Sequence, residues 1–217
     1  VYNAFLTVAH ADGDERYHQA VEHPLVNIHK YRDYQWGSSA DEYADSVEGA
    51  LNLLNRIPVE TGFKWVDVQA EKILHLQRGD GIIEGWHGDG NSARTLMMVA
   101  LWKTQGVMPT PWRHDLQLGA VRNDDGSLSI SLKTEMPWTG TLRFDRPRHR
   151  EFFHMPVDYP RINQFPEWFT IEVGKTYELQ VEGEAMTPVE GKALLNYPIS
   201  LDASESLRLT VRPKRHD

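Results

Sequence analysis

The chain has 217 residues and a formal net charge of −8, from 23 basic and 31 acidic side chains. Hydrophobic residues at 40% and charged residues at 25% are ordinary globular values and exclude a wholly disordered protein. The acidic balance argues against nucleic-acid binding, no apolar run approaches the ~18 residues of a membrane helix, and the lack of cysteine excludes thiol chemistry, disulfides and Cys-ligated zinc.

The start of the chain bears on its origin. It opens at Val1 within an apolar helical pattern, without an initiator Met and without a signal peptide. We therefore expect a processed chain or a fragment of a longer protein. Its compartment stays unknown; a secreted or periplasmic location is one interpretation, with the export signal lost upstream of Val1.

The first half of the chain is predicted to be helical. Apolar residues recur at helical spacing, and Asp12-Gly13-Asp14 combines a helix stop with a cap for the next helix. Ser39 and Glu42 have the spacing of a capping box. We expect helices over 1–10, 15–34 with a kink at Pro24, 39–56, 61–77 and 91–105, and we expect the last one, apolar on most sides, to be buried.

The helix expected over 39–56 has two distinct faces. Its apolar stripe consists of Ala40, Tyr43, Ala44, Val47, Leu51 and Leu54, and its polar stripe of Asp41, Asp45, Glu48, Asn52 and Asn55. Carboxylates one turn apart repel each other, which raises one pKa and suits a general acid. Asp45 and Glu48 are therefore candidate catalytic residues. A solvated outer face of the helix is the other interpretation of the same stripe.

A glycine-rich loop, 79–90, precedes the last predicted helix. It carries Glu84, Trp86, His87 and Asp89 among five glycines, and Asn91 and Arg94 follow in the helix. Aromatic rings stack on sugar rings and carboxylates transfer protons, so this combination is typical of a sugar site. Glu84 and Asp89 become the first catalytic candidates, and Trp86, His87, Asn91 and Arg94 the substrate-binding candidates. The alternative is structural: Asp89 or Asn91 caps the last helix, and His87 bonds to a buried carbonyl.

The second half of the chain is predicted to be β structure. Ten of the 12 prolines follow residue 107, and 108–111 has the composition of a linker. We therefore expect a helical domain over 1–107 and an antiparallel β-sandwich over 112–217, an α+β arrangement of helical hairpins followed by a sandwich. The expected strands are 116–122 and 127–133, joined by a hairpin turn at 123–126, then 141–145, 152–155, 169–173, 176–182 and 207–212.

Three further segments carry candidate features. Trp36 follows Tyr31, Arg32 and Tyr34, and is either a stacking subsite for sugar or padding under a loop. The basic group Arg143, Arg146, Arg148, His149 and Arg150 is either an anion site or a solvated charge run. The segment 159–168 is too apolar for a free loop, and we expect it to pack across the domain boundary rather than to bind a ligand.

Cofactor motifs do not occur in the sequence. It lacks HExxH, a Walker loop, GxSxG and a dinucleotide fingerprint after a strand. His87 and Asp89 come without an identifiable third metal ligand. We therefore expect no cofactor and no metal.

Two motifs carry a resemblance to a known group of proteins. Residues 41–50, Asp-Glu-Tyr-Ala-Asp-Ser-Val-Glu-Gly-Ala, and 85–94, Gly-Trp-His-Gly-Asp-Gly-Asn-Ser-Ala-Arg, precede a proline-rich β region. This order resembles the final hairpins of α/α-toroid carbohydrate-active enzymes, which include six-hairpin glycosidases and toroid polysaccharide lyases. The resemblance implies a sugar cleft lined by Trp86, His87 and Asp89. About five helices do not close a ring of six hairpins, so either the N-terminal part of the toroid is missing or the helices form a different, open assembly.

The functional expectation is cleavage of glycosidic bonds in an oligo- or polysaccharide by acid/base chemistry of carboxylates. Trp86 and Trp36 would stack on sugar. A polysaccharide lyase acting on a uronate-containing glycan is the alternative, with His87 or Tyr43 as base and Arg94 neutralising the uronate. A second alternative is a non-catalytic module that binds glycan or acts as a scaffold. The expected partners are a carbohydrate and the missing N-terminal part of the same enzyme, without nucleic acid or membrane.

Overall fold

A computed structural model of the chain describes residues 1–34, 39–86 and 88–214. The α+β class is confirmed, since helices come first and two antiparallel sheets follow. The chain divides into two compact units: the helical unit, residues 1–100 and 155–166, and the β unit, residues 101–154 and 167–217. Among the described residues, none of the helices combines the length and apolarity needed to cross a membrane.

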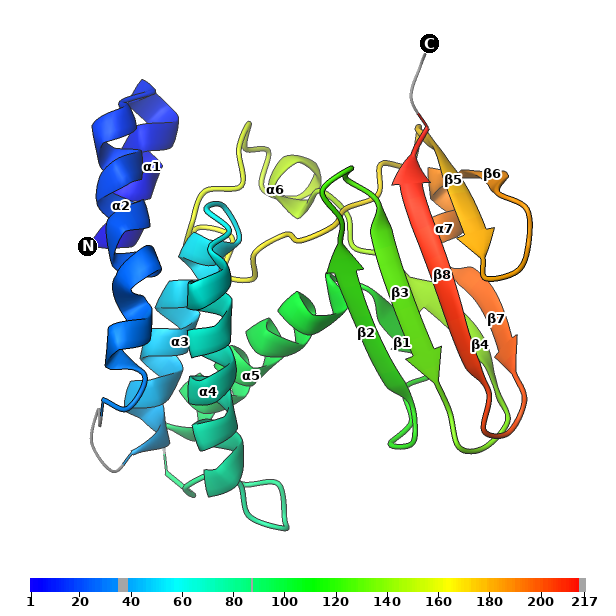
Figure 1. Ribbon diagram of the computed structural model, residues 1–217, viewed down its shortest axis with the longest axis horizontal. Helices are drawn as coiled ribbons and strands as arrows, with labels where there is room; N and C mark the ends of the chain where they lie inside the picture. The colour runs from blue at the N-terminus through cyan, green and yellow to red at the C-terminus, as the bar shows by residue number, and fades with distance from the viewer. Residues whose placement is uncertain (35–38, 87, 215–217) are drawn as a thin grey trace. The chain divides into compact units, whose positions relative to one another are not determined.

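The helical unit is built from antiparallel neighbours joined by short connections. In Figure 1, α1 lies beside α2, and α3 lies beside α4. Gly13, in the left-handed conformation with φ 67°, ends α1, and the Asp14 side chain caps α2. The elements are α1 (Tyr2–Asp12), α2 (Glu15–Asn27), the 3₁₀ helix η1 (Ile28–Tyr31), α3 (Ala40–Leu54), α4 (Glu60–Leu76) and α5 (Asp89–Thr104).

The apolar stripe predicted for α3 is confirmed as the core of this unit. All six of its residues are buried, and Leu51 and Leu54 are fully enclosed. Gly62 of α4 permits a close approach of the two helices, because a Cβ at this position would lie 2.6 Å from a methyl group of Leu54. The α3–α4 pair therefore forms a tight hairpin whose packing fixes the orientation of the polar stripe on α3.

The segment 155–166 belongs to the helical unit, although the chain enters it from the β unit. Arg56 anchors it, since its Nη2 lies 2.9 Å from Asp158 Oδ2 and its Nε donates to the Asp158 carbonyl at 2.9 Å. Both side chains are largely buried. Predicted boundaries near residue 107 put this segment in the β domain, because the pattern of a short apolar segment does not reveal which core it joins.

The β unit contains two antiparallel sheets. One has the strand order β1-β4-β7 and the other β2-β3-β8-β5-β6 (Figure 1). The strands are β1 (Met108–Thr110), β2 (Gln117–Arg122), β3 (Leu128–Lys133), β4 (Trp138–Arg143), β5 (Thr176–Val181), β6 (Thr187–Glu190), β7 (Tyr197–Leu201) and β8 (Ser206–Pro213). Two short helices, α6 (Arg148–Glu151) and α7 (Gly191–Leu194), complete the unit.

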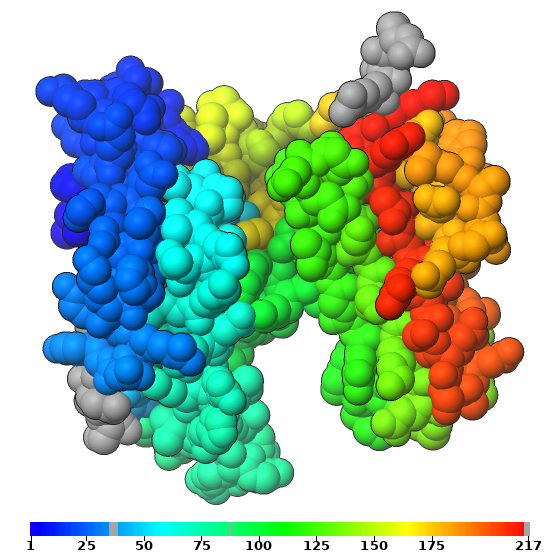
Figure 2. All heavy atoms as spheres, viewed as in Figure 1, coloured from blue at the N-terminus to red at the C-terminus, as the bar shows by residue number. Residues whose placement is uncertain are grey.

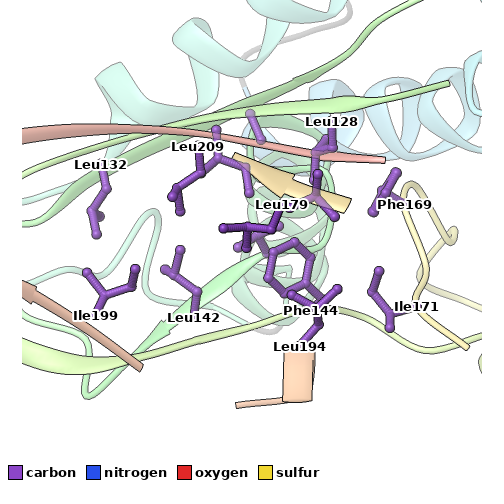
Figure 3. Close-up of a cluster of buried hydrophobic side chains, with 14 of the residues drawn as sticks. Leu128, Leu132, Leu142, Phe144, Phe169, Ile171, Leu179, Leu194, Ile199 and Leu209 are labelled. Carbon is purple, nitrogen blue, oxygen red and sulfur yellow. The ribbon is translucent and has the colours of Figure 1, made fainter. Parts of the chain in front are cut away.

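One apolar cluster lies between the two sheets. Figure 3 shows Leu132 and Leu209 on one side facing Leu142 and Ile199 on the other. Strand β3 buries alternate residues, since Leu128, Ile130 and Leu132 are buried within the cluster. The removal of this apolar surface from water is the main force that holds the sheets together.

Several strand predictions are confirmed and others are wrong. The β2–β3 hairpin forms around its predicted turn, in which Gly126 has a φ of 82° and Asn123 N donates to the Ser127 carbonyl at 2.8 Å. Residues 152–155 form no strand, because the chain leaves α6 there and exposes Phe152 and Phe153. Residues 169–173 make only an isolated bridge, and β1, β6 and β7 were not expected.

A buried carboxylate in the β unit joins the segment before β2 to the segment after β3. Asp115, 6% exposed, accepts from Arg113 Nη2 at 2.8 Å, from Thr134 Oγ1 at 2.9 Å and from the backbone N–H of Met136 at 3.2 Å. The Arg113 hydrogen bond, followed by those of Thr134 and Met136, holds the pKa of Asp115 far below its ordinary 3.8.

We expect the Asp115→Asn variant to be less stable than the parent at neutral pH, with a difference that shrinks in acid. A carboxyl group whose pKa is depressed by folding stabilises the fold above its ordinary pKa, and that contribution is lost as the pH falls below about 4. Urea unfolding at pH 7, 4 and 3 measures the gap, with Asp124→Asn in the exposed hairpin turn as control. A gap that stays constant over this range would contradict the expectation.

Candidate functional site

The glycine-rich loop follows α4 and is closed by local hydrogen bonds. Arg78 N donates to the Ile82 carbonyl at 2.7 Å, and Asp80 Oδ1 accepts from Ile82 N at 3.1 Å. With the end of α4, this loop forms the teal projection of the helical unit in Figure 2. Ile83 then returns to the core, where it is 7% exposed. The loop is thus anchored at both ends of its turn.

Glu84 caps α3 from outside that helix. Its Oε1 accepts from Ala40 N at 2.9 Å, and its Oε2 accepts from Ser39 Oγ at 3.2 Å and from Trp86 Nε1 at 2.7 Å. The expected capping box is therefore half right: Ser39 accepts from the backbone N–H of Asp41, but the reciprocal carboxylate comes from the loop rather than from Glu42. Three donors occupy the Glu84 carboxylate.

Asp89 ties the loop to the start of α5. Its Oδ1 accepts from Glu84 N and its Oδ2 from Gly85 N, both at 2.7 Å. Trp86 lies above this turn with 40% of its surface exposed, and Gly88 makes room for it, because a Cβ there would meet the indole at 2.7 Å. The structure thus presents an exposed indole on a loop that two carboxylates hold in shape.

We expect Asp89→Asn to destabilise the loop by about 1–3 kcal/mol, because one backbone N–H would then face an amide NH₂ instead of an acceptor. Hydrogen exchange at the Glu84 and Gly85 amides should accelerate by roughly tenfold or more. Glu71→Gln, at an exposed position of α4, is the control. Unchanged exchange at both amides would show that Asp89 does not hold the loop.

The polar stripe of α3 meets α5 through Asn91. Asn91 Nδ2 donates to Asp41 Oδ1 at 2.7 Å and to Asp45 Oδ1 at 2.9 Å. One amide group therefore holds both carboxylates close together. Asp45 is exposed and Asp41 half-buried, so this carboxylate pair reaches water.

Glu48, one turn further along α3, is fully buried. Its Oε2 accepts from Arg94 of α5, and its Oε1 accepts from Gln164 Nε2 at 2.9 Å and lies 2.8 Å from Arg161 Nη1. Asn52 is also fully buried, and its Oδ1 accepts from Arg161 N at 3.3 Å. The interpretation of the stripe as a solvated face is wrong for Glu48 and Asn52, because α5 and the segment 155–166 cover them.

The prediction of a buried last helix is also wrong in part. In α5 the buried residues are Ser92, Thr95 and Met98, whereas Met97 is 53% exposed. Ala93 and Ala100 are exposed as well and share a face with Met97, since they lie one turn to either side of it. Thr95 Oγ1 donates to the Ala44 carbonyl of α3 at 3.1 Å, so α5 buries the side that carries its polar contacts and exposes an apolar one.

The remaining candidates lie elsewhere. Trp36 and His87 fall outside the described residues. In the β unit, Arg146 pairs with Glu151, Arg148 with Asp145, Arg150 with Glu172 and His149 with Glu167. The three arginine ion pairs neutralise most of the basic group 143–150, and His149 Nδ1 lies 2.8 Å from Glu167 Oε2, so the structure offers no support for an anion site there.

Arg161 and Gln164 are the residues that sequence reasoning missed. Their segment was interpreted as apolar packing, and nothing in its pattern connects it to a helix more than 100 positions earlier. The signal that the sequence did carry was the presence of polar side chains, among them Arg161 and Gln164, in a segment rich in apolar residues.

Neither possible metal ligands nor similar proteins identify a function for these residues. Across residues 1–34, 39–86 and 88–214, no three His, Cys, Asp or Glu side chains gather in a way that could hold a metal ion. Comparison of the chain with protein families, curated proteins and solved structures gives no match.

Proposed function

We propose that this chain is the C-terminal part of an α/α-toroid carbohydrate-active enzyme that hydrolyses glycosidic bonds. Helical hairpins followed by two facing antiparallel sheets support a toroid segment joined to a β-sandwich. The exposed apolar face of α5 supports further helical hairpins of the same enzyme as its partner, because hydrophobic residues at one-turn spacing usually pack against another element.

One observation carries the proposal. The two polar segments singled out in the sequence, the stripe of α3 and residues 79–94, bond to each other through Asn91 and Arg94, and Glu84 caps the start of α3. These contacts bring the exposed indole of Trp86 and several carboxylates together near the N-terminal half of α3. Stacking on an indole and hydrogen bonding to carboxylates are how proteins bind pyranose rings.

The geometry favours Asp45 for proton transfer. Glu84 and Asp89 each bind two or more donors that fix the loop, and Glu48 is fully buried. Asp45 is exposed and holds its orientation through Asn91, as a group that meets a glycosidic oxygen or a water must. Asp41, which the same Asn91 amide holds, would act as its partner.

The position of Tyr43 removes one of the two bases expected for the lyase alternative; the other, His87, lies outside the described residues. The Tyr43 side chain is 5% exposed and lies on the apolar side of α3, with Lys72 of α4 5.2 Å from its ring centre. A base that removes a proton from a sugar must reach that sugar, so Tyr43 does not fit this role. A module that only binds glycan remains the alternative outcome of the test.

The test is incubation of the full chain with a panel of neutral and acidic oligo- and polysaccharides. We expect new reducing ends without the ultraviolet absorption of an unsaturated sugar, and loss of this activity in Asp45→Asn. Absorbing products would instead identify a lyase. Glycan binding without any cleavage, unaffected by Asp45→Asn, would identify a binding module and overturn the proposal.

A further inference from the structure

The segment 155–166 brings a second arginine to the buried carboxylate of α3. Arg161 Nη1 lies 2.8 Å from Glu48 Oε1, while Arg94 donates to Oε2 of the same group. Glu48 is 0% exposed, whereas the Arg161 and Arg94 side chains are 48% and 33% exposed. A shielded carboxylate thus holds two guanidinium groups that both reach the surface.

The charges in this group do not balance. Elsewhere in the described part of the chain, buried or half-buried arginines pair with a carboxylate each, as in Arg56–Asp158, Arg113–Asp115 and Arg148–Asp145. Here two arginines share Glu48, which leaves one positive charge over within the trio. A guanidinium has five N–H donors in a planar fork that matches carboxylate and sulfate oxygens.

Arg94 also has a buried N–H donor that is not used within the part of the chain that the structure describes. The Nε of Arg94 is buried, and within the described residues it has no hydrogen-bond partner. A buried donor without a partner is uncommon in native proteins and often marks the place of a water, an ion or a ligand. Arg94 therefore has donor capacity beyond its bonds to Glu48 and Asn91.

The backbone holds Arg161 in a defined position. Its φ is 67°, in the left-handed region that is unfavourable for a non-glycine residue. The hydrogen bond from Arg161 N to the buried Asn52 and the Arg56–Asp158 ion pair three residues earlier offset that cost. Such local strain is commonly retained where a side chain must be placed for function.

We propose that Arg94 and Arg161, supported by Glu48, recognise a carboxylate or sulfate group of the sugar substrate. Glu48 acts as a positioning residue, since it orients both guanidinium groups without reaching water. Asp41 and Asp45 lie one to two turns toward the N-terminus of α3 and would repel an anion above them, so the charged group binds at the arginines and the rest of the sugar extends toward Asp45. The inference rests on the proposed function for its choice of ligand, an acidic sugar.

Binding of monosaccharides to the full chain tests this without turnover. The probes are D-glucuronate, D-glucose 6-sulfate and D-glucose, titrated against the protein and followed by NMR. We expect one acidic sugar to bind about tenfold tighter than glucose, the value of one charge-assisted hydrogen bond. The stronger of the two acidic probes identifies the group. Equal affinities for all three sugars would overturn the inference.

Two variants separate recognition from folding. Arg161→Gln keeps a donor for Glu48 but should lose the preference for the acidic sugar, and its unfolding midpoint is measured alongside to confirm that the variant is folded at the temperature of the titration. Arg208→Gln, an exposed arginine of the β unit, is the matched control. Retention of the preference in Arg161→Gln would also overturn the inference. Acidic preference without cleavage of any glycan would overturn the proposed hydrolase but leave the recognition site standing, so the two failures are distinguishable.

Discussion

Replacing Glu48 with Gln is expected to destabilise the helical unit by about 3 kcal/mol, the lower end of the range for removing one partner of a buried ion pair. Glu48 is the shared counter-charge of Arg94 and Arg161 and is fully buried. Glutamine has nearly the same shape, but its NH₂ group would face a guanidinium donor. The value stays at the lower end because both arginines keep partial contact with water.

The measurement is urea unfolding. Far-ultraviolet circular dichroism at a helix wavelength follows the helical unit, and NMR signals of the β unit follow the other. The change should appear in the helical transition, because Glu48 and its partners all belong to that unit. Glu42→Gln on the same helix is the control; Glu42 is exposed and should cost less than about 1 kcal/mol through the helix dipole. Equal effects of the two substitutions would show that the Glu48 network adds nothing to stability.

Most helix boundaries were predicted within two residues because their signals are local, but the helix expected over 15–34 ends at Asn27 and the 3₁₀ helix η1 follows it. Ser39 with a following apolar stripe predicts a helix over 39–56, and α3 spans Ala40–Leu54. The hairpin turn at 123–126 was predicted for the same reason. Residues 152–155 misled the prediction, because exposed phenylalanines have the same pattern as a half-buried strand.

The candidate site was only partly predictable. Sequence reasoning found the α3 stripe and the loop 79–94 as separate candidates, since each has a dense local pattern of polar and aromatic residues. It did not find that they meet, or that Arg161 and Gln164 join them, because contacts over about 50 to 116 positions leave no local pattern. Burial of Glu48 likewise depends on which distant segment covers it.

The roles expected for the carboxylates also depend on such contacts. Asp89 and Glu84 were first choices because they share a glycine-rich loop with an indole. They accept hydrogen bonds from backbone N–H groups, a hydroxyl and an indole N–H, which fix the loop and the start of α3. A carboxylate that satisfies several structural donors is poorly suited to give up or take a proton during a reaction.

Replacing Asp45 with Asn is therefore expected to lower turnover of a cleaved glycan by about 10³-fold, within the range for loss of a general acid or base. Stability should change by less than about 0.5 kcal/mol, because Asp45 is exposed and an asparagine oxygen still accepts from Asn91. The matched control is Asp67→Asn on α4, also exposed, which should leave turnover unchanged.

Turnover and the urea midpoint have to be measured on the same preparations. A proton-transfer role predicts a large loss of kcat with little change in KM, because the asparagine still forms the ground-state hydrogen bonds but cannot exchange a proton. A purely binding role predicts the reverse, a higher KM at unchanged kcat. If Asp45→Asn instead retains full turnover, proton transfer must come from another carboxylate, and Asp41, the other member of the pair held by Asn91, is the next to replace.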